Sequence, residues 1–400
     1  LRAVNALISE PEPSRLPFLQ TASLKEKDPE IAQLMAIAMA AIELNGDSKD
    51  ARLRSVQALE KWPTAHSLTL LQARLDVESD NSVRSAITKS IALIGEKMAW
   101  GERLGALFSG LSQGSILLLI ALGLAITYGL MGIINMAHGE LMLIGAYATY
   151  VTQNAFSIWL PEATNWYLPV ALPASFLSAA CVGALLEWSV LRHLYGRPLE
   201  TLLATWGASL ILIQTMRSVF GAQNVAIANP SWMSGSIVLM NGLTIPWNRL
   251  VILMFALCVL IGLSLLISKT RLGLFIRGVT QNRPIASCMG VSTRKIDNLA
   301  FALGSGIAGL AGCALSQIGN VGPEMGQSYI VDSFMVVVLG GVGQLAGTVY
   351  ASMGLGLTTK WLEGFSGAVL AKVFVLFIVI AFIQKRPQGL FALKGRNLEN

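Results

Sequence analysis

The sequence predicts an all-α protein: a polytopic membrane region of about eight or nine spans, including a broken or re-entrant hairpin, preceded by an N-terminal helical extension. Of the 400 residues, 54% are hydrophobic and only 13% are charged, whereas soluble domains carry about 25% charged residues. Charged residues concentrate near the start, since residues 1–106 hold 13 Lys or Arg and 14 Asp or Glu. We therefore expect an extracytoplasmic extension over 1–104, a transmembrane domain over 105–392 and a cytoplasmic tail over 393–400.

Seven apolar stretches approach the length of about 20 residues that a spanning helix needs. They are 106–129, 139–158, 168–191, 202–220, 250–268, 298–318 and 367–383. Two glycine-interrupted segments, 330–341 and 345–359, lie before the last stretch. The first of them is too short to cross alone, so we expect the pair to form a hairpin or a re-entrant element buried in protein.

Lys and Arg residues are divided unequally between the connections. The connections 192–200 and 269–297 and the C-terminal tail hold twelve of them, whereas the opposing connections hold only Arg249. Basic residues accumulate on the cytoplasmic side of membrane proteins. We therefore predict a multi-pass membrane protein with a cytoplasmic C-terminus and an extracytoplasmic N-terminal segment.

The extension contains a short internal repeat. Asp50-Ala-Arg-Leu-Arg-Ser and Asp80-Asn-Ser-Val-Arg-Ser recur at an offset of 30 residues, and each begins an amphipathic helical pattern. Helix pairs of this period resemble HEAT-like repeats, which bury their apolar faces by stacking. The alternative is two helical hairpins without repeat ancestry.

The glycine motifs favour helix packing over nucleotide binding. Gly304-Ser-Gly306-Ile-Ala-Gly309 has a dinucleotide-binding spacing, but it lies inside an apolar helix with no preceding strand. Small residues in membrane helices let a neighbouring helix approach closely. We expect this packing role for Gly304, Ser305, Gly309, Gly312, Gly340 and Gly341.

No catalytic residue, cofactor or metal site is expected. The four cysteines show neither metal-ligand nor disulfide spacing, and only three histidines are present. An intramembrane enzyme would need a nucleophile–base pair or metal ligands inside the spans. No phosphate-binding loop is visible either, so any ATP must be hydrolysed by another subunit, and no nucleic-acid partner is expected.

Polar residues cluster at the join between the first two spans. Gly132-Ile-Ile-Asn-Met-Ala-His-Gly-Glu140 contains the candidate pathway residues Asn135, His138, Gly139 and Glu140. Polar groups at membrane depth face a cavity or a neighbouring helix, because lipid exposure costs several kcal/mol. Three interpretations stay open: helix caps in a wet cytoplasmic turn, the lining of a translocation pathway, or contact with a cytoplasmic partner.

The basic connection 270–297 contains the other notable feature. A short helix is expected to start at Pro284 and to be closed by Gly290, in keeping with the preference for Pro at helix starts and Gly after helix ends. On the cytoplasmic side such a helix is a docking element, unless the connection is a basic loop that touches anionic lipid.

These features resemble the permease subunits of branched-chain amino acid ABC importers. The resemblance covers about 105–392 and rests on Gly129-Leu-Met-Gly-Ile-Ile-Asn-Met-Ala-His-Gly-Glu140, the Arg271–Ser292 loop and Val336-Val-Val-Leu-Gly-Gly-Val-Gly343. It implies a second homologous permease subunit, two cytoplasmic ATPase subunits and an extracytoplasmic solute-binding protein, in addition to membrane lipid. It also implies a location in the bacterial cytoplasmic (inner) membrane. It also implies an ATPase-coupling loop that contains Gln281, Asn282, Arg283, Ala286, Met289 and Gly290. Ala286 is expected to pack into a groove of the ATPase.

Within that family the chain looks most like the urea-importer permeases. The stretch Arg192-His-Leu-Tyr-Gly-Arg-Pro-Leu-Glu-Thr-Leu-Leu-Ala-Thr-Trp-Gly207 and the repeat-bearing extension carry this likeness. The resemblance therefore implies a pathway for a small polar solute, urea first of all. The alternatives are a branched-chain amino acid or amide permease of the same family, and, from other classes, a passive urea channel or a secondary transporter.

Overall fold

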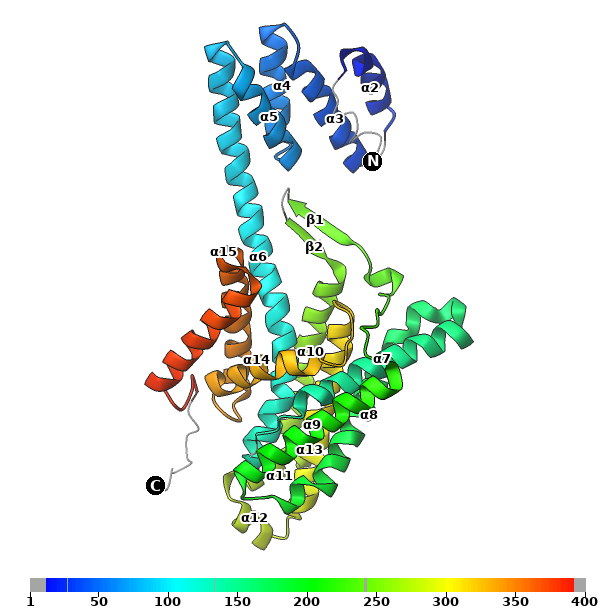
Figure 1. Ribbon diagram of the computed structural model, residues 1–400, viewed down its shortest axis with the longest axis vertical. Coiled ribbons are helices and arrows are strands. Elements are labelled where there is room, and N and C mark those ends of the chain that lie inside the picture. Colours follow the sequence, from blue (N-terminus) through cyan, green and yellow to red (C-terminus); the bar gives the residue numbers. More distant parts are fainter. Residues whose placement is uncertain (1–11, 27, 133, 241–242, 392–400) are drawn as a thin grey trace. The chain divides into compact units, whose positions relative to one another are not determined.

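The computed structural model describes residues 12–26, 28–132, 134–240 and 243–391. The chain divides into two compact units, Leu1–Gly105 with Ile237–Ile245 and Ala106–Ser236 with Pro246–Asn400. Helices make up most of both (Figure 1), which confirms the prediction of an all-α fold. The expected tail 393–400 lies outside the described residues.

The first unit is a small helical bundle with one β-hairpin. Its elements are η1 (Pro13–Arg15), α2 (Leu16–Ser23), α3 (Pro29–Leu44), α4 (Lys49–Lys61), α5 (Ala65–Val77), the start of α6 (Asn81–Met131), β1 (Ser236–Met240) and β2 (Leu243–Pro246). The two repeat motifs fall at the starts of α4 and α6. HEAT-like ancestry stays a prediction. The expected extension and the first expected span are joined within α6, which is one continuous helix.

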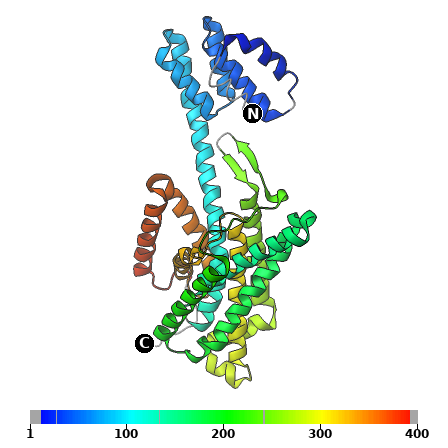
Figure 2. The same ribbon diagram turned by 45° about the vertical axis from the view of Figure 1, so that its right-hand side comes forward.

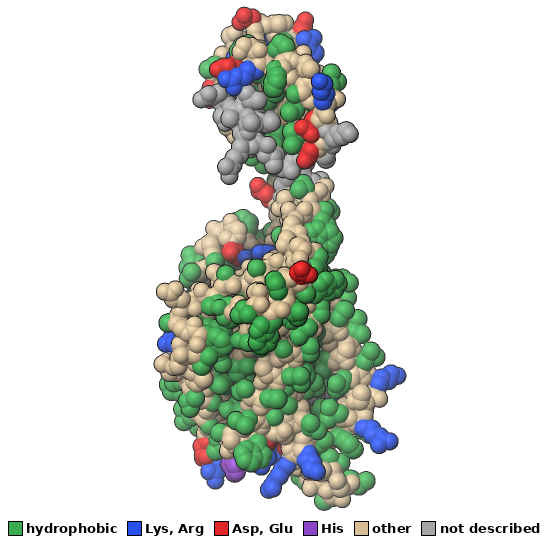
Figure 3. Space-filling model, turned by 90° about the vertical axis from the view of Figure 1, so that its right-hand side faces the viewer, with side chains coloured by type: hydrophobic (Ala, Val, Ile, Leu, Met, Phe, Trp, Pro, Cys, Tyr) green, Lys and Arg blue, Asp and Glu red, His purple; other side chains and the backbone are tan. Residues whose placement is uncertain are grey.

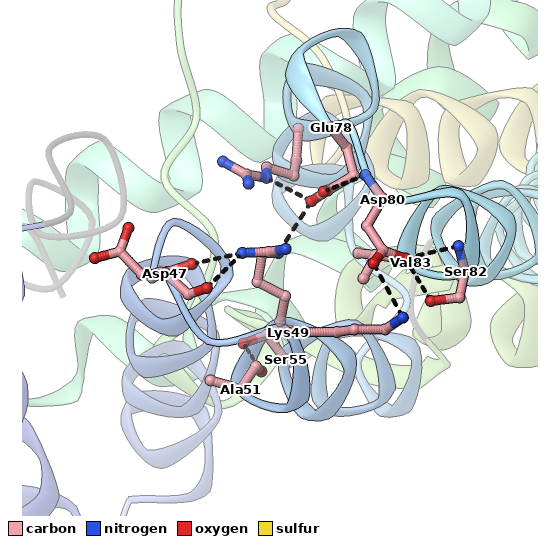
Figure 4. A network of polar contacts seen from close by, with 11 residues as sticks. Asp47, Lys49, Ala51, Ser55, Glu78, Asp80, Ser82 and Val83 are labelled. Atoms are coloured by element: carbon pink, nitrogen blue, oxygen red, sulfur yellow. Dashed lines mark hydrogen bonds and ion pairs between the residues drawn. The ribbon is translucent and has the colours of Figure 1, made fainter.

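A network of ion pairs connects the turns of this bundle (Figure 4). The Glu78 carboxylate is buried between two arginines, with its Oε2 atom 3.1 Å from both Arg52 Nε and Arg74 Nε. Its Oε1 atom accepts a hydrogen bond of 3.1 Å from the Asp80 amide, and Asp80 in turn forms an ion pair with Lys49 at 3.0 Å. Arg52 also donates to the carbonyl oxygen of Asp47 at 3.0 Å. One carboxylate therefore holds the α3–α4 and α5–α6 turns together.

These partners set the pKa of Glu78. Burial alone would raise this pKa, but the hydrogen bond from Asp80 and the charges of the two arginines lower it below the ordinary value of 4.5. A lowered pKa means that the ionised carboxylate contributes stability above pH 4.5, and that this stability is lost as the pH falls through the pKa of the folded state.

We predict that Glu78→Gln weakens the α4 region at pH 7 by about 1–2 kcal/mol, because the two arginines lose a charged acceptor. The difference from the wild type should vanish in acid, where Glu78 is itself protonated. Hydrogen-exchange protection of the Lys49–Lys61 amides in the full chain measures both effects. Asp76→Asn, an exposed carboxylate on α5, is the control. Equal protection in Glu78→Gln and the control would contradict the role of the network.

The second unit contains the rest of the chain. Its elements are the remainder of α6, α7 (His138–Trp159), η2 (Pro161–Trp166), α8 (Tyr167–Ser189), η3 (Leu191–His193), α9 (Pro198–Phe220), η4 (Ser231–Met233), α10 (Trp247–Lys269), α11 (Arg271–Gln281), α12 (Arg283–Cys288), α13 (Thr293–Ser316), α14 (Met325–Gly340) and α15 (Leu345–Lys385).

Among the described residues, six helical segments are long and apolar enough to cross a membrane. They are α6, the run Pro161–His193, α9, α10, α13 and α15. α7 has the length of a span but is not among these six, because Thr149, Thr152, Gln153 and Asn154 in its second half add to His138 and Glu140 at its start. Figure 3 shows hydrophobic side chains over most of one face of this unit, with Lys and Arg gathered towards its lower edge. A polytopic membrane protein is therefore confirmed.

α13 lies at the centre of this unit, among α6, α7 and α8 (Figure 2). Its small residues do not form the single packing face that the sequence suggests. Gly304 lies against the Gly123 backbone of α6, whereas Gly309 lies against Ser175 of α8 and also against α7. Gly312 meets the carbonyl oxygen of Met142 in α7. Small side chains recur around the helix because three helices approach it closely.

The expected hairpin corresponds to α14 and α15, but its boundaries differ. α14 begins at Met325 rather than at 330, and helical structure continues from Leu345 to Lys385 with one kink at Gly367. Gly340 packs against the backbone of Gly347, as expected for a packing residue. Gly341 is instead a turn residue, because its φ of 99° allows the chain to reverse after α14.

Two charged residues near span ends are buried or paired rather than solvated. Asp332 lies inside α14, not at a helix start, and forms an ion pair of 3.3 Å with Lys372 of α15. Glu187 is fully buried, and its Oε2 atom accepts a hydrogen bond of 2.7 Å from Asn298 of α13. Protein therefore encloses Glu187, and its side chain does not extend to the membrane interface.

We predict that Gly309→Leu prevents correct packing of the membrane unit. A Cβ atom at Gly309 would lie 2.6 Å from the Ala179 Cβ, and the backbone of α8 cannot give way cheaply. Gly262→Leu in α10 is the matched control, because nothing lies within 4 Å of a Cβ added there. Size-exclusion profiles in detergent should show aggregation of Gly309→Leu only. A normal profile for Gly309→Leu would show that α13 tolerates a wider separation.

Candidate functional site

The join between α6 and α7 buries its polar side chains. Asn135 and His138 have no solvent-exposed surface. The Asn135 Oδ1 atom accepts a hydrogen bond of 3.1 Å from the Ala137 amide, which orders the turn immediately before α7 begins. Protein encloses these residues, so the interpretation of a wet cytoplasmic turn is wrong.

Several polar atoms at this join have no partner among the described residues. His138 Nε2 lies 3.0 Å from the carbonyl oxygen of Ile120 in α6, but its Nδ1 atom is buried without a hydrogen bond. Asn135 Nδ2 and Glu140 Oε2 are likewise buried and unpartnered. Buried polar atoms without partners are costly, and they gather at sites where a solute or water binds. We refer to Asn135, His138 and Glu140 as the polar join.

α9 contributes a polar face to the polar join. Thr201, Thr205 and Ser209 are its buried hydroxyl residues, spaced one helical turn apart, while the opposite face of α9 is exposed. The Met136 amide donates to Thr205 Oγ1 at 3.2 Å, which places this face of α9 beside the polar join. These residues were not predicted from the sequence, although hydroxyls at i, i+4 and i+8 in an apolar helix were a visible signal.

Gly139 has a helix-packing role and contributes no side chain to the candidate translocation pathway. A Cβ atom there would meet the backbone of Gly326, close to the start of α14. The absence of a side chain lets α14 approach α7 beside Glu140. Asn135, His138 and Glu140 therefore supply polar groups, whereas Gly139 allows the close approach of α14.

α12 is a short helix with well-formed ends. The Asn282 Oδ1 atom accepts a hydrogen bond of 3.0 Å from the Ile285 amide and caps its start. At its end, Gly290 has a φ of 85° and donates to Ser287 O at 3.1 Å, while Val291 donates to Ala286 O at 3.1 Å. This pair of bonds is the Schellman motif. The helix starts one residue before Pro284, close to its predicted position.

The faces of α12 differ from expectation. Ala286 is only 7% exposed and packs in a cluster of buried hydrophobic residues with Ile296 and Ala300 of α13. It cannot pack into the groove of another subunit, so that part of the prediction is wrong. Ile285 is 60% exposed and Met289 is 79% exposed, and these two side chains form the apolar outer face of α12.

Ion pairs and hydrogen bonds connect α12 with α13 and α8. The Arg283 guanidinium forms an ion pair with the fully buried Asp297 carboxylate of α13 and lies 4.6 Å from the centre of the Tyr195 ring. The next residue of α13, Asn298, donates to Glu187 and, at 2.9 Å, to the Ala184 carbonyl of α8. α12 is therefore held to the centre of the membrane unit and is not a free loop.

α11 was not predicted as a helix. Thr270 caps its start by accepting a hydrogen bond of 3.2 Å from the Gly273 amide, and Ile276 and Val279 are buried. A cavity of about 550 Å³ lies between α11, α6 and the α14–α15 turn. Gln281, Arg277 and Thr280 line it, so Gln281 faces this cavity in addition to preceding α12.

No metal centre is evident in the described part of the chain. Those residues contain no group of three or more His, Cys, Asp and Glu side chains placed to hold a metal ion. Hydrogen bonding and apolar contact are the chemistry that the polar join and α12 offer.

Comparison with known proteins decides the family. Residues 106–383 match the permease component of branched-chain amino acid transport systems. The chain belongs to this family. The matched range holds both the polar join and α12, and its members are transport subunits of ABC importers rather than enzymes.

Curated relatives agree with the family match. The permease protein BraD of the high-affinity branched-chain amino acid transport system of Pseudomonas aeruginosa is 28% identical over 71% of this chain and 94% of its own length. LivH of Salmonella typhimurium is 28% identical over 70% of this chain and 95% of its own. A probable LivH of Methanocaldococcus jannaschii is 27% identical over 76% and 96%. No solved structure matches. These names favour an amino acid permease over the urea permease that the sequence resemblance suggested first.

We predict that Glu140→Gln preserves the fold and weakens solute transport, because it keeps the shape of the side chain and removes its charge. The apparent KM should rise about tenfold or more if the carboxylate contacts the solute. Glu162→Gln, an exposed carboxylate in η2, is the matched control. Uptake into proteoliposomes that contain the full transporter measures the effect. Wild-type KM in Glu140→Gln would remove this carboxylate from the pathway.

Proposed function

We propose that this chain is the translocation subunit of an importer driven by ATP hydrolysis on separate subunits, and that its cargo is a branched-chain amino acid. The family match supports the importer, and the polar join supports the pathway. The observation with most weight is the set of buried, unpartnered polar atoms on Asn135, His138 and Glu140.

The chemistry of the polar join suits a small zwitterion. The Glu140 carboxylate and the His138 Nδ1 atom offer acceptors to an ammonium group, since His138 Nε2 already donates to the Ile120 carbonyl oxygen, and the Asn135 amide offers a donor to a carboxylate. Thr205 and Ser209 add neutral hydroxyls on one side. Urea could also hydrogen-bond to such groups, but it would not use the charge of Glu140. The names of the relatives also favour the amino acid.

α12 is proposed as the element that receives the movement of the ATPase. A rigid body is needed, because a flexible loop would absorb the movement. The Asn282 cap, the Gly290 Schellman motif and the Arg283–Asp297 ion pair all support such rigidity. The outer face of Ile285 and Met289 offers an apolar contact to a partner.

The proposed assembly contains two permease subunits, two cytoplasmic ATPases and an extracytoplasmic solute-binding protein. The chain lies in the inner membrane, and we propose that α11 and α12 face the cytoplasm while the first unit lies outside. The uneven distribution of Lys and Arg between the connections supports this orientation.

Met289→Glu should abolish transport while leaving the membrane unit folded, since the side chain is exposed and its own chain does not need it. A buried charge without a partner at the contact costs several kcal/mol, so the ATPase subunits should be lost on purification or stay unstimulated by solute. Met289→Leu is the matched control. Transport at wild-type level in Met289→Glu, with ATPases bound, would show that α12 is not the coupling element.

The cargo and energy source are tested together by reconstitution with the partner subunits and the binding protein. We expect leucine uptake that requires ATP and is not reduced by excess urea. Uptake without ATP would indicate a channel or a secondary transporter, and competition by urea would restore the urea interpretation.

A further inference from the structure

α8 and α13 form an open concave surface of about 640 Å³ where the end of α8 meets the start of α13. It belongs neither to the polar join nor to the outer face of α12. Arg192, Arg294 and Lys295 line one part of it. The remaining part is apolar or aromatic, formed by Cys181, Leu185, Trp188 and Leu299.

The three cations of this surface have no acidic partner in the described chain. The two nearest acids in sequence are already engaged, because Glu187 accepts from Asn298 and Asp297 pairs with Arg283. Both carboxylates are also fully buried. Arg192 lies 5.5 Å from the centre of the Trp188 ring, and its Nε atom is buried without a hydrogen bond. The surface therefore presents three unneutralised positive charges.

The apolar part of the surface is equally uncovered. Leu185, Trp188 and Leu299 are exposed large hydrophobic residues, and they continue along α8 and α13 away from the charges. A water-soluble anion would neutralise the cations but would leave these side chains bare. A ligand that carries both a negative headgroup and acyl chains would cover the whole surface.

We propose that this surface is a binding site for an anionic phospholipid. Arg294 and Lys295 bind its phosphate, Arg192 and the Trp188 ring bind the headgroup beside it, and Leu185 and Leu299 contact the acyl chains. Basic pockets between membrane helices on the cytoplasmic side are suited to this class of lipid. Only the choice of the leaflet that supplies the lipid depends on the orientation proposed above.

The location gives the lipid a position from which it could influence coupling. Lys295 and Asn298 flank Asp297, which holds Arg283 of α12. A phosphate bound at Lys295 would brace the first turn of α13, the helix that contacts both α12 and α8.

Native mass spectrometry of the full chain, purified with its copurifying subunits, tests the site. Phosphatidylglycerol should bind and phosphatidylcholine should not. Arg294→Gln combined with Lys295→Gln should weaken phosphatidylglycerol binding roughly thirtyfold. Lys269→Gln combined with Arg271→Gln removes two exposed positive charges from the same connection and is expected to leave binding unchanged.

A second variant and a headgroup competitor distinguish a lipid site from a free-anion site and from a subunit interface. Cys181→Trp fills the apolar part of the surface without changing its charge and should also reduce phosphatidylglycerol binding. This variant tests the site if the double variant does not fold. Glycerol phosphate alone should not displace the lipid, and displacement would indicate a free-anion site and overturn the proposal. Equal binding of both lipids would also overturn the proposal. Loss of the second permease subunit from a variant whose lipid binding is unchanged would overturn it in favour of a subunit interface.

Discussion

The membrane unit depends on how closely three helices approach α13. Gly304 meets Gly123 of α6, and Gly309 lies against Gly145 of α7 as well as against α8. Lipid tails are as apolar as leucine, so membrane helices gain little from burying apolar surface against one another. Close contact between backbones supplies van der Waals attraction instead. A larger side chain at any of these points would push a helix outward, and the elements attached to it would move with it.

α13 touches both parts of the proposed mechanism. Its first turn contains Asp297, which holds Arg283 of α12, and its middle contains Gly304. Gly304 packs on Gly123, and a Cβ atom added to Gly123 would also lie 3.0 Å from the His138 ring. A continuous chain of packed groups thus runs from α12 to the polar join. Such a chain is a physical route for coupling, although only a measured effect on transport demonstrates one.

The sequence predicted element types well and side-chain directions poorly. Asn282 and Gly290 mark the ends of α12 because capping is local chemistry. The glycines in α13 indicate close packing, but not which of three helices approaches each of them. Ala286 was assigned to a partner but is buried in its own chain, since burial of a short helix depends on how the next helix, α13, packs against it, and capping signals do not show this. The contribution of Thr205 to the polar join was missed because it requires α9 to lie beside a turn 69 residues away.

If α12 passes the movement of the ATPase to the membrane unit, α12 and α13 must move as one body, held by the Arg283–Asp297 ion pair. The number of solute molecules transported per ATP hydrolysed measures this coupling. Asp297→Asn keeps the shape of the side chain but removes the charge that holds Arg283. In the reconstituted transporter, we predict that ATP hydrolysis continues while transport per ATP falls at least about tenfold. A wild-type ratio in a correctly assembled Asp297→Asn transporter would contradict it.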